Sequence, residues 1–242
     1  MNAEPGHFYA VGVGPGAPDL LTLRAARLIE SCDALIAPRS ERSESSLALG
    51  IVRAHLRDQE ILEHSYAMTR DQARARDTWA AAAHWAAARL EAARSVVQIT
   101  LGDPLIYSTS SYLLQALRKR IGPERIHVVP GISAAQAAAA AFQEDLALQE
   151  DRLTLMPATN LAAVSEALDH SETVVLYKVA DRLDGLIDLL EQRCLLDHAR
   201  LAFAVEQERE RLVPDLRSAR GTRLGYLAVV LVRTGHRDWE AR

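Results

Sequence analysis

The chain has 242 residues, which is enough for one large domain or two small ones. Hydrophobic residues make up 49% of it and charged residues 25%, a balance typical of globular proteins. The formal net charge of −4 provides no positive field that would attract nucleic acid or an acidic membrane surface. No apolar run of about 18 residues is present, so we expect no membrane-spanning segment.

The first residues, MNAEPGHFYA, lack the charged-then-apolar order of a signal peptide, and Cys32 and Cys194 have no CxxC partner. We therefore expect a cytoplasmic protein whose two cysteines are small core residues without a disulfide. The eight histidines are scattered and form no HxH or HExxH pattern, so we expect no protein-bound metal.

Strand-like and helix-like segments alternate along the first half of the chain. The Ala-rich stretch from 71 to 95 has the strongest helix signal, because alanine is the best helix former. Thr22 or Asp19 is expected near the start of the first helix. The predicted order is strand 7–13, helix 21–31, strand 33–38, helix 71–95, strand 95–101 and helix 108–120, with the polar stretch 39–46 as a loop.

The second half continues the alternation after a short break, IGPER, near Gly122. We therefore predict an α/β fold of two domains, 1–121 and 122–242, with largely parallel sheets. The last two strands have no clear helix between them, which favours an antiparallel addition there. The predicted order is strand 126–130, helix 133–142, strand 152–158, helix 161–170, strand 172–179, helix 183–194, and strands 201–207 and 225–233.

Three turns marked by glycine and proline follow predicted strands. The first, VGVGPGAPD at 11–19, looks like a phosphate-binding loop, but Pro15 interrupts the dinucleotide pattern. The strand at 33–37 ends in Ala-Pro rather than in an acidic ribose ligand, and no Gly-Lys-Ser/Thr follows. The other two turns are LGDPLIY at 101–107 and VVPGISA at 128–134. Because ligands bind beyond the carboxyl ends of parallel strands, all three are candidate binding segments.

Each turn also has a purely structural interpretation. The glycines at 12–16 permit tight packing, Asp103 is a common turn residue as well as a candidate ribose ligand, and Ser133 is a natural helix N-cap. The three turns in this order are far more specific than any one of them.

Taken together, VGVGPGAPDLLTLRAARLI, ITLGDPLIYST and VVPGISA resemble the tetrapyrrole (corrin and porphyrin) methyltransferase family over essentially the whole chain. The segments APRSERSESSLAL, TLGDPLIYSTSSYL, VVLYKV and GYLAVVLV resemble most closely the family members that methylate C20 of precorrin-2 or of its cobalt form. Two positions depart from the pattern: Ala17 replaces an acidic residue, and EAARS at 91–95 replaces a glycine-bearing turn.

The resemblance implies the tetrapyrrole methylase fold of class III methyltransferases, with an active-site cleft between two α/β domains, and a homodimer. The first domain would bind the tetrapyrrole, and the second would form the site for S-adenosylmethionine (SAM) together with the GDP turn. The residues implied to contact SAM are Pro15, Leu101, Gly102, Asp103, Ile106, Tyr107, Ser133, Ala134, Tyr177, Lys178, Phe203, Ala204, Leu227 and Ala228. We expect Asp103→Ala to weaken SAM binding and to leave the fold intact.

The implied substrate carries acetate and propionate carboxylates, for which guanidinium groups are suitable partners. Arg39, Arg42 and Arg70 are the candidates, with Gly14 as a backbone contact, and a solvated loop is the alternative for the arginines. A proton must leave the methylated carbon, so a base or a water is required. Candidates for the base are Tyr107, Tyr66 and His64, for each of which a surface or core role is the alternative.

Three other functions stay open. The chain could methylate another precorrin position or uroporphyrinogen III, although YST after GDP and the YKV strand argue against this. An RNA methyltransferase of the same fold is disfavoured by the acidic charge. A dinucleotide-sensing module without enzymatic activity is disfavoured by the missing acidic residue after the second strand.

Overall fold

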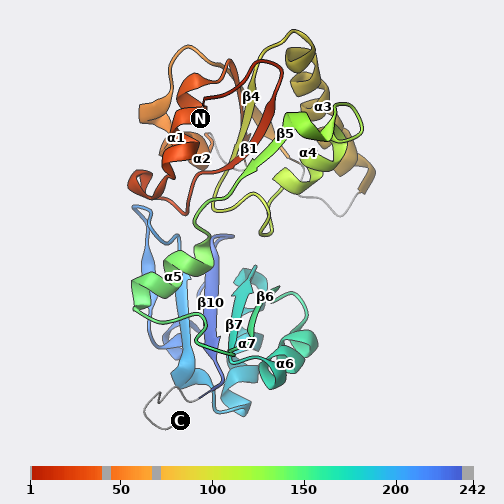
Figure 1. The fold of residues 1–242 in the computed structure, drawn as a ribbon. Helices are drawn as coiled ribbons and strands as arrows, with labels where there is room; N and C mark the ends of the chain where they lie inside the picture. The colour runs from red at the N-terminus through yellow and green to blue at the C-terminus, as the bar shows by residue number, and fades with distance from the viewer. Residues whose placement is uncertain (1, 40–44, 67–71, 236–242) are drawn as a thin grey trace. The chain divides into compact units, whose positions relative to one another are not determined.

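The computed structural model describes residues 2–39, 45–66 and 72–235, and for 72–76 only the backbone. The chain divides into two compact units, Met1–Ser133 and Ala134–Arg242, each of which is an α/β layered structure (Figure 1). The predicted break near Gly122 falls inside the first unit. The reason is that the strand after it, β5 (Ile126–Val129), pairs with β1 (Phe8–Gly12) of the first sheet.

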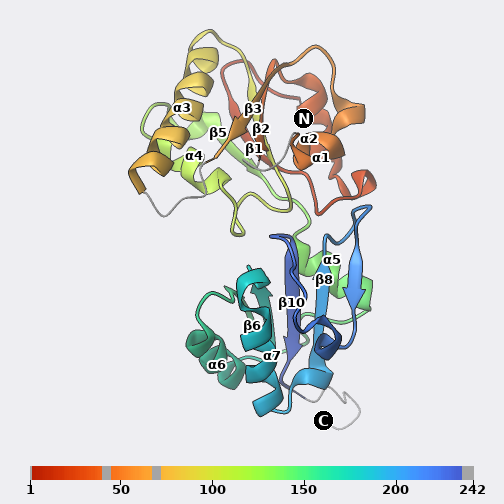
Figure 2. The same cartoon turned by 180° about the vertical axis from the view of Figure 1, so that it is seen from behind.

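The first unit contains a parallel five-stranded sheet in the order β3-β2-β4-β1-β5. Figures 1 and 2 show helices on both of its faces, α1 and α2 on one and α3 and α4 on the other. The other elements of this unit are α1 (Leu23–Ser31), β2 (Ala34–Arg39), α2 (Leu47–Ile51), β3 (Glu60–Ser65), α3 (Gln72–Glu91), β4 (Val96–Thr100) and α4 (Ser110–Leu117).

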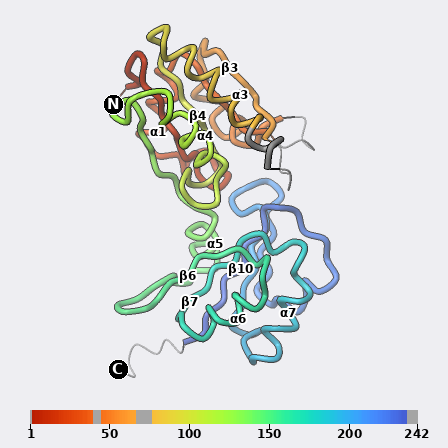
Figure 3. The backbone as a smooth tube through the Cα atoms, turned by 90° about the vertical axis from the view of Figure 1, so that its right-hand side faces the viewer, coloured from red at the N-terminus to blue at the C-terminus, as the bar shows by residue number. Residues whose placement is uncertain are grey.

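Alternating strand residues fill two cores in this unit. Tyr9 and Val11 of β1 pack towards α1 and α2, whereas Phe8 and Ala10 pack towards α3 and α4. Helix α3 runs beside α4, as Figure 3 shows from the side. Small side chains let α3 approach the sheet closely, because Ala82, Ala83 and Ala86 are all buried in that core.

The second unit contains the sheet β6-β7-β10-β8-β9. Strands β6 and β7 are parallel, and β10 runs antiparallel to both of its neighbours, which confirms the predicted antiparallel addition. The prediction of largely parallel sheets holds for the first sheet but is wrong for the second, where β8 and β9 are antiparallel as well. Helices α6 and α7 pack on one face of the sheet and α5 contacts β8 and β10. The bounds are α5 (Ala134–Phe142), β6 (Leu153–Pro157), α6 (Leu161–His170), β7 (Thr173–Tyr177), α7 (Leu183–Gln192), β8 (Ala199–Phe203), β9 (Arg211–Val213) and β10 (Ala228–Arg233).

Several local predictions can be compared directly with the structure. Thr22 is one of the two residues expected near the start of the first helix. It caps α1, because its hydroxyl accepts a hydrogen bond from the amide of Ala25 at 3.2 Å. The sequence interpretation missed β3, α2 and β9, and it was wrong about Cys194, which is exposed. Single turns of 3-10 helix occupy Pro18–Leu20, Arg53–His55, Pro123–Arg125, Ala180–Arg182, Leu196–His198 and Leu216–Ala219.

Candidate functional site

The three glycine-marked turns meet at one edge of the first sheet. They follow β1, β4 and β5, which are adjacent and parallel, so their carboxyl ends share that edge. Gly14 and Gly102 exchange backbone hydrogen bonds, of 2.7 Å from the Gly102 amide and 3.3 Å from the Gly14 amide. Segments almost 90 positions apart therefore form a single backbone assembly.

Close approach of main chains explains why these turns contain glycine. A Cβ atom on Gly131 would lie 2.2 Å from the carbonyl oxygen of Gly102, and one on Gly12 would lie 2.5 Å from the same oxygen. Gly14 and Gly102 also have positive φ angles of 80° and 69°. Gly12 and Gly131 were not among the predicted site residues. Their signal was present in the motifs, but only the fold shows that they touch.

Asp103 joins two of the turns. Its Oδ1 accepts a hydrogen bond from the Leu105 amide at 2.8 Å, and its Oδ2 accepts one from the Gly131 amide at 3.0 Å. The first bond is the turn-forming contact expected of an aspartate two residues upstream. The second holds the GDP turn against the Pro-Gly turn. Asp103 therefore holds this edge together, and we expect Asp103→Ala to lower the stability of the fold, in contrast to the expectation from sequence alone that the fold stays intact.

The remaining predicted SAM residues of the first unit flank this assembly. Pro15 follows Gly14 directly, Leu101 precedes Gly102, and Ser133 ends the unit two positions after Gly131. Ile106 and Tyr107 follow the GDP turn, where the hydroxyls of Thr100 and Ser108 lie 3.0 Å apart. The structure thus gathers the N-terminal set around the carboxyl ends of β1, β4 and β5.

The predicted residues of the second unit gather at one edge of the second sheet. Strand β10 runs antiparallel to β7 and β8, so its amino end lies beside their carboxyl ends, with Ala228 opposite Phe203 and Val229 opposite Tyr177. The amide of Ala204 donates to the carbonyl of Leu227 at 3.2 Å. Lys178 directly follows Tyr177 in the chain, and Ala134 begins α5.

Left-handed backbone recurs among these residues. Tyr107, Lys178 and Ala204 have φ angles of 51°, 56° and 48°, which side-chain-bearing residues adopt at a cost. Other left-handed residues, such as Gln143 and Cys194, follow helices, where this conformation is an ordinary way to end the helix. Lys178 and Ala204 instead follow strands, and such conformations are concentrated at ligand-binding segments.

Arg39, the described candidate for binding substrate carboxylates, ends β2 opposite Ser65 of β3. It therefore lies at the same carboxyl edge of the first sheet as the glycine turns. Arg42 and Arg70 lie outside the described residues.

The three candidate bases differ in their surroundings. Tyr66 is only 4% exposed, its hydroxyl accepts a hydrogen bond from Gln98 at 3.3 Å, and burial raises its pKa. Burial also raises the pKa of Tyr107, although its side chain is partly exposed. His64 is half-buried, and burial lowers its pKa, an effect that a hydrogen bond to the carbonyl of Thr78 partly opposes. Only a group that is unprotonated near neutral pH can accept a proton, which favours the histidine.

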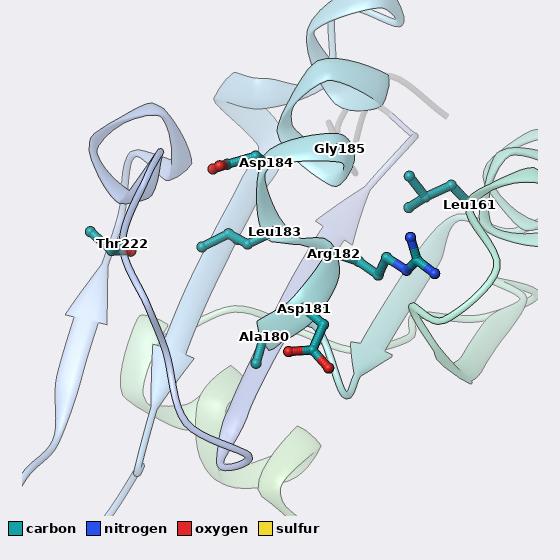
Figure 4. Close-up of a pocket in the computed structure, with 8 residues that line it drawn as sticks. All are labelled: Leu161, Ala180, Asp181, Arg182, Leu183, Asp184, Gly185 and Thr222. Carbon is teal, nitrogen blue, oxygen red and sulfur yellow. The ribbon is translucent and has the colours of Figure 1, made fainter. Parts of the chain in front are cut away.

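A separate pocket lies in the second unit around the start of α7 (Figure 4). Its volume of about 190 Å³ is smaller than the roughly 300–1,000 Å³ of typical ligand sites, and its lining contains none of the predicted site residues. It is lined by Leu161, Ala180, Asp181, Arg182, Leu183, Asp184, Gly185 and Thr222.

Within the described ranges, no three His, Cys, Asp or Glu side chains are placed to share a metal ion. The same part of the chain contains no helix with the length and apolar composition needed to cross a bilayer.

With this geometry established, comparison with known proteins identifies the class. The family model of Tetrapyrrole (Corrin/Porphyrin) Methylases matches residues 7–214, and the chain belongs to this family. A cobalt-precorrin-2 C(20)-methyltransferase from Salmonella typhimurium is 36% identical, over 97% of this chain and 98% of the relative. A probable cobalt-precorrin-2 C(20)-methyltransferase from Methanocaldococcus jannaschii is 32% identical over 80% of each chain.

Solved structures support the same fold. The uroporphyrin-III-C-methyltransferase from Thermus thermophilus aligns with a TM-score of 0.68, covering 95% of this chain and 94% of that one. The two sequences are 22% identical, so this likeness concerns the fold. The predicted two-domain α/β architecture and the predicted family are both confirmed.

Proposed function

We propose that this protein transfers a methyl group from SAM to C20 of cobalt-precorrin-2 or of precorrin-2, in the formation of the corrin ring of cobalamin. The observation that carries the proposal is the backbone assembly of Gly14, Gly102 and Gly131, built from the three family motifs. Nearly full-length similarity to proteins named for this reaction supports it. Both of these relatives are named for the cobalt-loaded substrate, which is therefore the first to test.

The residues present suit SAM as a ligand. At the first edge, the close packing leaves room only for glycines. No side chain therefore lies between the main-chain groups of these residues and a ligand. At the second edge, left-handed backbone at Lys178 and Ala204 is a form of preorganisation expected where a ligand is held. We infer that, in each unit taken by itself, the residues that the family resemblance implies are suited to contact SAM.

SAM, when bound, supplies a methyl group that is already activated as a sulfonium. The protein's contribution is then to hold the two reactants in line, to exclude water and to take up the proton that leaves C20. Arg39, at the carboxyl end of β2, would pair with a substrate carboxylate through its planar guanidinium. Arg42 and Arg70 are assigned the same role from the sequence alone.

We further propose that the enzyme is a cytoplasmic homodimer without a metal ion of its own and without a nucleic-acid or membrane partner. Cobalt, in this proposal, enters only as part of the substrate. The acidic net charge supports the exclusion of nucleic acid and acidic membrane surfaces.

The proposal is tested by offering the purified protein SAM with cobalt-precorrin-2, precorrin-2 or uroporphyrinogen III in parallel. One added methyl on either precorrin-2 form, and none on uroporphyrinogen III, is the expected result. A titration with SAM and with NAD, followed by calorimetry, is the companion test, in which only SAM should bind. Methylation of uroporphyrinogen III alone, or binding of NAD alone, would contradict the proposal.

A further inference from the structure

A hydrogen bond to the main chain of α3 determines which ring nitrogen of His64 carries the hydrogen. Its Nε2 lies 2.8 Å from the main-chain carbonyl oxygen of Thr78 in α3. A carbonyl oxygen can only accept a hydrogen bond, so Nε2 must carry the hydrogen. In the neutral ring, Nδ1 then has a free lone pair.

That lone pair is available to an incoming group. Among residues 2–39, 45–66 and 77–235, and the main chain of 72–76, none makes a hydrogen bond with Nδ1 of His64. The ring is held in place by the Thr78 carbonyl and by Tyr66, whose ring packs edge-on at 4.7 Å between centroids. Burial lowers the pKa of His64, which favours the neutral ring near pH 7.

The position of His64 also suits the reaction. It lies opposite Pro38 near the carboxyl end of β3, one residue before the Arg39–Ser65 pair, and so at the edge of the sheet that carries the glycine turns. Strand β3 is two strands away from β4, a backbone separation of roughly 10 Å. A single macrocycle bound by Arg39 at the end of β2 would extend over the distance between β3 and β4.

The tyrosine candidates are less suitable. A base must give up its own proton first, and burial raises the pKa of both Tyr66 and Tyr107. The Tyr66 hydroxyl is also occupied by Gln98.

We propose that Nδ1 of His64 removes the proton from C20 of the methylated tetrapyrrole. This rests on the proposed function. A π-electron pair of the macrocycle forms the bond from C20 to the methyl carbon as the methyl–sulfur bond breaks, and the electron pair of the broken bond stays on sulfur. The C20–H bond then breaks, its electron pair restores the conjugation of the macrocycle, and the proton goes to Nδ1. The imidazolium keeps its hydrogen bond to Thr78 and later releases the proton to solvent.

The variant His64→Gln separates this role from a structural one. The amide nitrogen of glutamine can occupy the Nε2 position and keep donating to the Thr78 carbonyl, but the side chain has no comparable proton acceptor. We expect turnover to fall about 10²–10⁴-fold with SAM affinity and thermal stability unchanged. His55→Gln is the matched control, because His55 pairs with Glu30 at 2.7 Å on the surface before β3, and it should retain wild-type turnover.

Two further readouts do not depend on the rate alone. Deuterium at C20 of the substrate should produce a larger isotope effect in His64→Gln than in the wild type, because proton removal becomes slower. Nitrogen-15 spectra of the ligand-free wild-type protein should show His64 as the neutral tautomer with hydrogen on Nε2.

The outcomes separate the two proposals. A wild-type protein that methylates none of the substrates contradicts the proposed function. A wild-type protein that is active while His64→Gln matches it in rate and isotope effect overturns the role of His64. A spectrum with hydrogen on Nδ1 overturns that role whatever the activity.

Discussion

At the residue scale, the candidate site depends on backbone contacts that leave no room for side chains. Gly12, Gly102 and Gly131 come from three turns, and any Cβ on Gly12 or Gly131 would collide with main-chain atoms. The sequence predicted which turns matter, because each has glycine beside proline after a strand. It could not predict their mutual contacts, since those depend on which strands are neighbours in the sheet.

Asp103→Ala should destabilise the first unit as well as weaken SAM binding. The substitution removes the acceptor of both the Leu105 and the Gly131 amides, and an unsatisfied partly buried amide costs about 1–3 kcal/mol. The free energy of unfolding in denaturant should fall by that amount. Asp58→Ala, an exposed position before β3, is the control and should change it little. Unaltered stability of Asp103→Ala would show that the carboxylate does not hold the turns together.

At the scale of elements, the long α3 helix is followed by a left-handed residue that is not glycine. Ala93, in the segment EAARS that departs from the family pattern, has a φ of 56°, a conformation that usually belongs to glycine. The chain thus makes a glycine-like turn without glycine. Arg94, next to it, binds Glu60 at 2.5 Å and so anchors the segment to the start of β3.

Ala93→Gly should therefore stabilise the protein, in contrast to a glycine inside α3. We expect a gain of roughly 1 kcal/mol from relief of the left-handed conformation. Ala80→Gly, at an exposed position inside the same helix, should lose about 1 kcal/mol. Thermal unfolding of the two variants measures both effects. A loss of stability in Ala93→Gly would mean that the turn does not have this conformation.

The pairing of β1 with β5 contains a titratable contact at its amino end. His7 Nδ1 and His127 Nε2 lie 2.9 Å apart, and Tyr9 stacks on His127 at 4.8 Å. Burial, followed by the neighbouring His7, lowers the pKa of His127, although Glu4 opposes this. The folded state then binds a proton less readily than the unfolded chain. Stability is consequently complete above the ordinary histidine pKa of about 6.5 and is lost as the pH falls below it.

Denaturant unfolding at pH values above and below about 6.5 tests this directly. The wild type should be less stable at the lower pH, and His127→Phe should show a smaller difference between the two values because it removes the titrating ring. An equal pH dependence in both proteins would exclude His127 as its source.

At the scale of the whole molecule, the sequence predicted the α/β class, most of the helices and strands, and the antiparallel end. The helices and strands that it missed were of one kind. β3 is an edge strand with polar residues on both faces, α2 is a five-residue helix, and β9 has three residues. Such elements are too short or too polar to produce a clear hydrophobic period. The domain break was placed early because the IGPER turn precedes β5, whose partner lies far away in sequence.

Methylation of C20 by this protein can be followed with SAM labelled with carbon-13 in the methyl group. After incubation with cobalt-precorrin-2 or with precorrin-2, the position of the label in the product is read by NMR. We expect a single labelled methyl group attached to the C20 meso carbon. A label at another carbon of the macrocycle, or no transfer to either substrate, would contradict it.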